Sequence, residues 1–146
     1  MMARFFTHFF IIAFLLNFLW EITQMYFFTG MGMGQIEYYN LFLKTHWLVS
    51  LKDAAMVLVL YVVIGLILRN WHWGRHFTKK RLGLLFILGF LWAVGIEYYH
   101  VNIHHDWAYA ANMPLLPLLK VGLLPVLQMI TLPAVAIWLA KKDLFV

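Results

Sequence analysis

The chain has 146 residues, of which 64% are hydrophobic and only 12% are charged, and it contains no cysteine. Soluble domains carry about 25% charged residues, so this composition excludes an ordinary soluble domain and indicates an integral membrane protein. The lack of cysteine excludes disulfide bonds, thiol catalysis and thiolate metal sites. The net charge of +5 comes from basic residues at the ends of apolar segments, so we expect no nucleic-acid partner.

Four apolar segments are long enough to cross a bilayer, which takes roughly 20 helical residues. They cover about residues 5–29, 46–68, 82–104 and 115–140. Backbone inside a bilayer must satisfy its own hydrogen bonds, and the apolar runs lack the alternation of barrel strands, so we predict helices. The expected fold class is all-α: one membrane domain over residues 1–146, an integral membrane four-helix bundle.

The fourth segment holds the prolines that bear on its shape. We expect Pro114 and Pro117 to begin this helix, and Pro125 or Pro133 to kink it and release a backbone carbonyl into the interior.

Lys and Arg predict the orientation of the bundle. Residues 69–81, between the second and third segments, hold five of them, Arg4 precedes the first segment, and Lys141 and Lys142 follow the fourth. The positive-inside rule assigns this side to the cytoplasm. We therefore expect a multi-pass protein of the bacterial inner membrane with both termini cytoplasmic.

Three carboxylates lie inside the apolar segments: Glu21, Asp53 and Glu97. An ionisable side chain in a membrane span is costly unless it is paired, so it marks a candidate functional site. The expected topology places all three in the outer half of the membrane, whereas the inner halves are almost entirely apolar. This segregation predicts a polar pocket that opens toward the outer face of the membrane and has an apolar base without water.

Further polar residues repeat at helical spacing and so share a face with the carboxylates. They are Asn17, Glu21 and Gln24 on the first helix, His46, Ser50 and Asp53 on the second, and Glu97, His100 and His104 on the third. Because lipid cannot accept such stripes, they are expected to face one another, joined by Gln128 from the fourth helix. Lys52 and Lys120 either reach the membrane surface or enter the cluster as counter-ions.

One hypothesis is acid-base chemistry, with Glu21, Asp53, Glu97 and His100 as candidate catalytic residues. Carboxylates crowded in a low-dielectric cavity cannot all ionise, so one is expected to donate a proton while another stays charged. Aromatic rings could shelter a cationic intermediate of an isoprenoid or sterol-type substrate. The candidate pocket residues are Asn17, Trp20, Gln24, Ser50, Trp92, Tyr98 and Gln128.

A second hypothesis adds a divalent metal. Glu97 and His100 form a Glu-x-x-His pair, the spacing that supplies two ligands from one helix in di-metal bundles, and the donor set suits iron, manganese or zinc. The candidate ligands are Glu97, His100, Glu21, Asp53, His46 and His104. The pair occurs once, whereas di-metal bundles repeat it on a second helix, so an ordinary buried hydrogen-bonded pair is the alternative.

Two non-enzymatic alternatives remain. Small membrane bundles can serve as a non-catalytic subunit or assembly factor of a larger complex, in which buried polar groups join subunits. Intramembrane carboxylates also mark proton or metal-ion pathways. The inner half offers only Tyr61 and Thr131 as polar steps, so transport would require a homo-oligomer.

Two stretches, NFLWEITQMYFF (17–28) and WAYAANMPLLPLLKVGLLPVLQMITLP (107–133), resemble segments of small four-helix bacterial inner-membrane proteins without a characterised activity. The resemblance covers about a third of the chain. It implies a shared part formed by Trp20, Glu21, Gln24, Trp107, Tyr109, Pro114, Pro125 and Gln128, and it implies no function.

Overall fold

The computed structural model describes residues 2–28 and 36–144, and this part of the chain is helical without strands. The helices are α1 (Met2–Gln24), α2 (Ile36–Ile67), α3 (Lys79–Tyr98) and α4 (Leu123–Ala140). A 3-10 turn, Met25–Phe27, follows α1, a π-helical turn, Tyr99–His104, continues α3, and a 3-10 turn, Lys141–Leu144, follows α4. The all-α prediction is confirmed.

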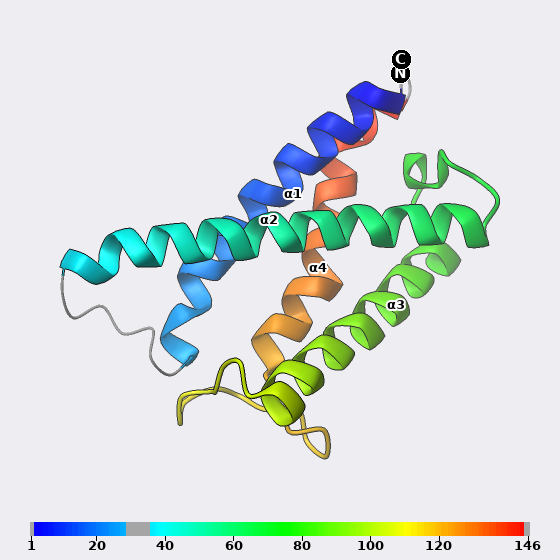
Figure 1. The fold of residues 1–146 in the computed structure, drawn as a ribbon. Helices are drawn as coiled ribbons and strands as arrows, with labels where there is room; N and C mark the ends of the chain where they lie inside the picture. Colours follow the sequence, from blue (N-terminus) through cyan, green and yellow to red (C-terminus); the bar gives the residue numbers. More distant parts are fainter. Residues whose placement is uncertain (1, 29–35, 145–146) are drawn as a thin grey trace.

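Four helical segments of the described residues are long and apolar enough to cross a membrane, and the first and third extend beyond α1 and α3 through the turns that follow them. The segments are Met2–Phe27, Thr45–Ile67, Lys79–His104 and Leu123–Ala140. In Figure 1 the two termini lie together at one end of the bundle, and α1 packs along both α2 and α4. By contrast, α2 packs only sparsely on α3, and the two diverge away from the loop that joins them (Figure 1).

The predicted start of the fourth helix at residue 115 is wrong, because α4 begins at Leu123. The preceding residues fold back on themselves: the Leu116 N–H donates to the Val121 carbonyl at 2.8 Å, and the Leu123 N–H donates to the Pro114 carbonyl at 2.8 Å. Leu118 and Lys120 have positive φ angles of 72° and 53°, which no right-handed helix contains. Pro114 and Pro117 therefore belong to a loop.

Pro125 does not kink α4, because it lies in the first turn of the helix, where a backbone N–H has no intrahelical acceptor. Pro133 is inside the helix.

The limits of the other three helices also differ from the predicted ones. The helix α1 ends at Gln24, and residue 29, where the first span was predicted to end, lies outside the described residues. The helix α2 begins ten residues before the predicted start at residue 46 and ends at Ile67. The third helix begins three residues before the predicted residue 82.

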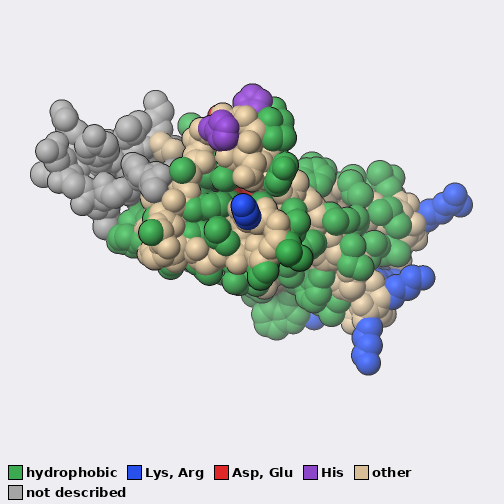
Figure 2. All heavy atoms as spheres, turned by 90° about the horizontal axis from the view of Figure 1, so that it is seen from below, with side chains coloured by type: hydrophobic (Ala, Val, Ile, Leu, Met, Phe, Trp, Pro, Cys, Tyr) green, Lys and Arg blue, Asp and Glu red, His purple; other side chains and the backbone are tan. Residues whose placement is uncertain are grey.

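An aromatic plug formed by Phe5, Phe9, Tyr61 and Trp73 fills the bundle at the end that carries the termini. All four side chains are fully buried, and the rings of Tyr61 and Trp73 stack with centroids 4.8 Å apart. The Trp73 indole N–H donates to the Tyr61 carbonyl at 3.0 Å, so the loop between α2 and α3 folds back into the bundle. This end is apolar inside, as the sequence predicted, and Figure 2 shows Lys and Arg side chains gathered at one end of the molecule.

Close helix packing on the other side of the bundle depends on a small residue. A Cβ atom added to Gly89 on α3 would lie 2.6 Å from the backbone carbonyl oxygen of Met129 on α4. Small residues allow such an approach between membrane helices. From this contact α3 continues for about two turns to Glu97, and it ends beside the start of α4 (Figure 1).

Candidate functional site

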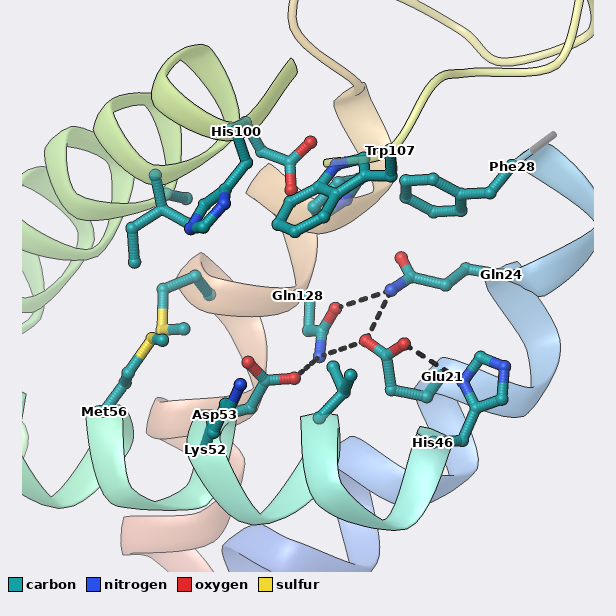
Figure 3. Close-up of a pocket in the computed structure, with 16 residues that line it drawn as sticks. Glu21, Gln24, Phe28, His46, Lys52, Asp53, Met56, His100, Trp107 and Gln128 are labelled. Carbon is teal, nitrogen blue, oxygen red and sulfur yellow. Dashed lines mark hydrogen bonds and ion pairs between the residues drawn. The ribbon is translucent and has the colours of Figure 1, made fainter. Parts of the chain in front are cut away.

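A cavity of about 200 Å³ lies between the helices, toward the end opposite the aromatic plug. Figure 3 shows the side chains that line it. They are Glu21, Gln24 and Phe28 from the α1 region, His46, Val49, Lys52, Asp53 and Met56 from α2, Ala93, Ile96, Glu97 and His100 from the α3 region, Trp107 from the following loop, and Pro125, Gln128 and Met129 from α4. The structure thus brings together all four candidate catalytic residues around one space.

Gln128 is the centre of a hydrogen-bond network that joins three helices. Its Nε2 lies 2.8 Å from Asn17 Oδ1, 3.1 Å from Asp53 Oδ2 and 3.3 Å from Glu21 Oε1. Its Oε1 accepts a hydrogen bond from Gln24 Nε2 at 3.1 Å. Because an amide NH₂ has two hydrogens, the longest of these contacts, to Glu21, shares a hydrogen with another. A single buried side chain of α4 therefore connects to α1 and α2 (Figure 3).

Glu21 receives the most N–H contacts of the three carboxylates. Gln24 Nε2 donates to Glu21 Oε1 at 2.6 Å, and His46 Nδ1 lies 3.4 Å from Glu21 Oε2. The helix α2 presents His46 to Glu21 one turn before Ser50, whose hydroxyl donates to the His46 carbonyl at 2.7 Å. Ser50 is fully buried and lies behind the cavity wall. Asn17 also stays outside the lining and acts through Gln128.

Glu97, on the opposite wall, accepts a hydrogen bond from the hydroxyl of Tyr109. Burial raises the pKa of Tyr109 above its ordinary value of 10.0, and the bond to Glu97 raises this pKa further. Tyr109 therefore keeps its proton at neutral pH and acts as a donor. The loop that carries it is fixed to the 3-10 turn after α1, because the Ala110 N–H donates to the Phe27 carbonyl at 2.9 Å.

The residues after α3 bring an imidazole and an indole to the cavity. The His100 ring stacks on Trp107 with centroids 4.4 Å apart, and His100 Nδ1 lies 2.5 Å from Asp106 Oδ2. His100 sits in the π-helical turn Tyr99–His104, a distortion that is frequent at functional sites. His100 therefore contacts Asp106 as well as lining the cavity beside Glu97.

The predicted aromatic lining is different from the observed one. Trp92 and Tyr98 do not line the cavity, and their side chains are 38% and 50% exposed. Tyr98 directly follows Glu97, and successive residues of a helix point about 100° apart. Trp20 also lies outside the lining and donates its indole N–H to Gln24 Oε1 at 3.0 Å. The aromatic residues of the lining are Phe28 and Trp107.

Phe28, Trp107 and Tyr109 were not among the predicted site residues. The resemblance to bacterial membrane proteins includes Trp107 and Tyr109, and this was their only sequence signal. Both lie in a loop, where no helical periodicity connects them to Glu97.

Five of the six candidate metal ligands line the cavity, but they are not placed to share one ion. Over residues 2–28 and 36–144, no group of three or more His, Asp and Glu side chains is placed to hold a metal ion. His104 is bound to the Tyr99 hydroxyl at 2.7 Å and lies outside the cavity lining, and His100 faces Asp106. Of the two lysines, Lys52 lines the cavity, whereas Lys120 lies in the loop before α4 and is exposed.

These observations define a helical protein with four potential membrane spans and a polar cavity at one end of the bundle. Comparison of the chain with protein families, with curated proteins and with solved structures found no match in any of the three. The cavity alone therefore carries the functional argument.

Proposed function

We propose that this protein carries out acid-base chemistry on a lipid-like molecule whose reacting end enters the cavity among Glu21, Asp53 and Glu97. The observation that carries the proposal is that three carboxylates from three different helices line one space. Crowded carboxylates in a poorly solvated site divide the roles of proton donor and proton acceptor between them.

The hydrogen bonds suggest how the roles are divided. N–H donors stabilise the negative charge of a carboxylate, and the side-chain amides of Gln24 and Gln128 both lie within hydrogen-bond distance of Glu21 Oε1. Glu21 is thus suited to accept a proton. Among the described residues, Gln128 donates to Asp53 and Tyr109 donates to Glu97, which leaves oxygen atoms of both carboxylates available to a bound molecule.

The size of the cavity limits what can enter. A volume of about 200 Å³ is below the roughly 300–1,000 Å³ of pockets that take drug-sized ligands. An isoprenoid or sterol-type molecule would therefore place only one end in the cavity. The remainder would lie among the lipids around the helices.

The membrane setting is part of the proposal. The basic residues that flank the spans favour a bacterial inner membrane with both termini in the cytoplasm, and the cavity would then open on the outer side. The chain contains no cysteine, so two variants with one cysteine each, His72→Cys and Leu118→Cys, can be treated with a membrane-impermeant maleimide in intact cells. Only the cysteine at position 118 should react.

A metal-assisted version of the chemistry and the two non-enzymatic alternatives have less support. Among residues 2–28 and 36–144, no three of the candidate metal ligands are placed to hold one ion. The described polar side chains of the network bond to one another within the chain, so they need no partner subunit to satisfy them. For transport, the aromatic plug fills the opposite end of the bundle.

The test compares membrane lipids from cells that lack the protein with cells that express it or its variants. Asp53→Asn and Glu97→Gln, which keep the shape of the side chains, should reproduce the lipid changes caused by the deletion. Tyr98→Phe, an exposed position on the same helix as Glu97, is the matched control and should restore the normal profile. Unchanged lipids in the two carboxylate variants, with normal protein levels, would refute an enzymatic role.

A further inference from the structure

The charged groups of the cavity are arranged in an order that indicates what kind of lipid it binds. The carboxylates of Asp53 and Glu97 belong to its lining, on α2 and α3. Lys52 also lines the cavity, and it is exposed, whereas Asp53 is half-buried and Glu97 is buried. The cavity is therefore acidic within and basic at its entrance.

Lys52 is available to a ligand. It forms no ion pair with a carboxylate in residues 2–28 and 36–144, although Asp53 is its neighbour in the chain. It lies in the apolar span Thr45–Ile67, where an unpaired cation is costly. An anionic group at the mouth of the cavity would remove this cost.

The carboxylates have matching capacity for a cation. A carboxylate offers about four acceptor sites, and Asp53 and Glu97 each use one of them in the hydrogen bonds described above. A primary ammonium has three N–H donors and no acceptor. These donors can be shared between the two carboxylates, and Gln128 lines the same cavity.

Two potential membrane spans border the cavity. The cavity is lined by Met56 and Ile96 from the two helices that pack sparsely and diverge, α2 and α3. Because both helices belong to potential membrane spans, a lipid that approaches the cavity between them would keep its acyl chains in the bilayer. A volume of about 200 Å³ holds about six or seven groups of the size of a water molecule, at roughly 30 Å³ each. This is enough for a small headgroup and too little for its hydrocarbon chains.

We propose that the cavity binds the zwitterionic headgroup of a membrane lipid that carries a primary ammonium on a phosphate. The ammonium lies between Asp53 and Glu97, the phosphate binds Lys52, and the acyl chains remain in the bilayer between α2 and α3. This proposal rests on the proposed acid-base function. It names a phosphoethanolamine lipid, rather than an isoprenoid or sterol, as the substrate class. The acid-base step is then transfer of a proton from the ammonium nitrogen to a carboxylate oxygen, which leaves a neutral amine.

Binding can be measured without turnover, on purified full-length protein in maltoside micelles. The probes are lysophosphatidylethanolamine, lysophosphatidic acid, which lacks the ammonium, dodecylamine, which lacks the phosphate, and free phosphoethanolamine, which lacks the chain. We expect lysophosphatidylethanolamine to bind at least tenfold more tightly than each of the others, since one charge-assisted hydrogen bond contributes about that factor.

Substitutions of single residues test which side chain binds the phosphate and which binds the ammonium group. Lys52→Gln should weaken lysophosphatidylethanolamine about tenfold and leave dodecylamine unchanged, and Lys52→Arg should preserve most of the binding. Asp53→Asn should weaken both amines and leave lysophosphatidic acid unchanged. Lys120→Gln, a lysine of the loop before α4, is the matched control and should bind like the parent protein.

Three results would overturn the inference: equal binding of lysophosphatidic acid and lysophosphatidylethanolamine, equal effects of Lys52→Gln and Lys120→Gln, or tight binding of free phosphoethanolamine, which would indicate a soluble ligand. Circular dichroism and gel filtration establish that each variant is folded. The purified protein could show no preference for lysophosphatidylethanolamine while the Asp53→Asn and Glu97→Gln cells still show the lipid changes. That outcome would reject the proposed headgroup and leave the proposed acid-base function standing.

Discussion

Replacing Gln128 with Leu removes the side chain that connects α4 to α1 and α2, while keeping a similar volume in a position that is 4% exposed. The variant loses two donated hydrogen bonds and the one accepted from Gln24. At roughly 0.6–1 kcal/mol for each hydrogen bond between membrane helices, the free energy of unfolding should fall by about 2–3 kcal/mol.

The assay is reversible unfolding in mixed micelles of maltoside and dodecyl sulfate, followed by circular dichroism. Thr131→Val is the matched control, because Thr131 lies on the same helix, is exposed, and donates its hydroxyl to the carbonyl of Leu127 in its own helix at 2.7 Å. Its effect should stay below about 0.5 kcal/mol, as for surface substitutions in general. Equal stability of the two variants would refute the conclusion that the Gln128 network holds the helices together.

Three other substitutions test separate parts of the structure by the same unfolding assay. Gly89→Ala should destabilise the protein by about 1–3 kcal/mol because its Cβ would meet a backbone carbonyl of α4, whereas Gly95→Ala, with no atom within 4 Å, should stabilise it by up to about 1 kcal/mol; the same sign for both would contradict the packing. Tyr109→Phe should cost about 1–2 kcal/mol, unlike Tyr98→Phe. The raised pKa of Tyr109 means that the unfolded chain loses this proton first as the pH rises above 10, so stability should fall there, and less steeply in Tyr109→Phe. Trp73→Phe removes the indole N–H bond to α2 and should cost about 2–4 kcal/mol; a neutral result would mean that the plug does not stabilise this end.

The apolar composition and the spacing of polar residues predicted the four helices and much of the cavity. Asn17, Glu21 and Gln24 are separated by four and three residues, and all three are buried on one face of α1. The same rule placed Asp53 and Glu97 toward α1 and α4. Helical geometry determines the direction of these side chains, so the sequence was sufficient.

The loops, and the contacts that loop residues make with the helices, could not be predicted from the sequence. The stretch from Leu115 to Lys120 is as apolar as a membrane helix, but backbone hydrogen bonds across the loop and the positive φ angles of Leu118 and Lys120 fold it back. Amino-acid composition does not predict such hydrogen bonds. The contact of Tyr109 with Glu97 joins a loop to a helix, and no local pattern predicts which loop residue reaches a buried carboxylate.

The central claim is that the end of a lipid-like molecule occupies the space between Asp53, Glu97 and Gln128. The most direct measurement is an experimental density map of the protein purified from its native membranes and crystallised from a lipidic mesophase. Our account predicts elongated density that enters between α2 and α3 and ends at the two carboxylates. A cavity that contains only water, with α2 and α3 closed over it, would contradict the account.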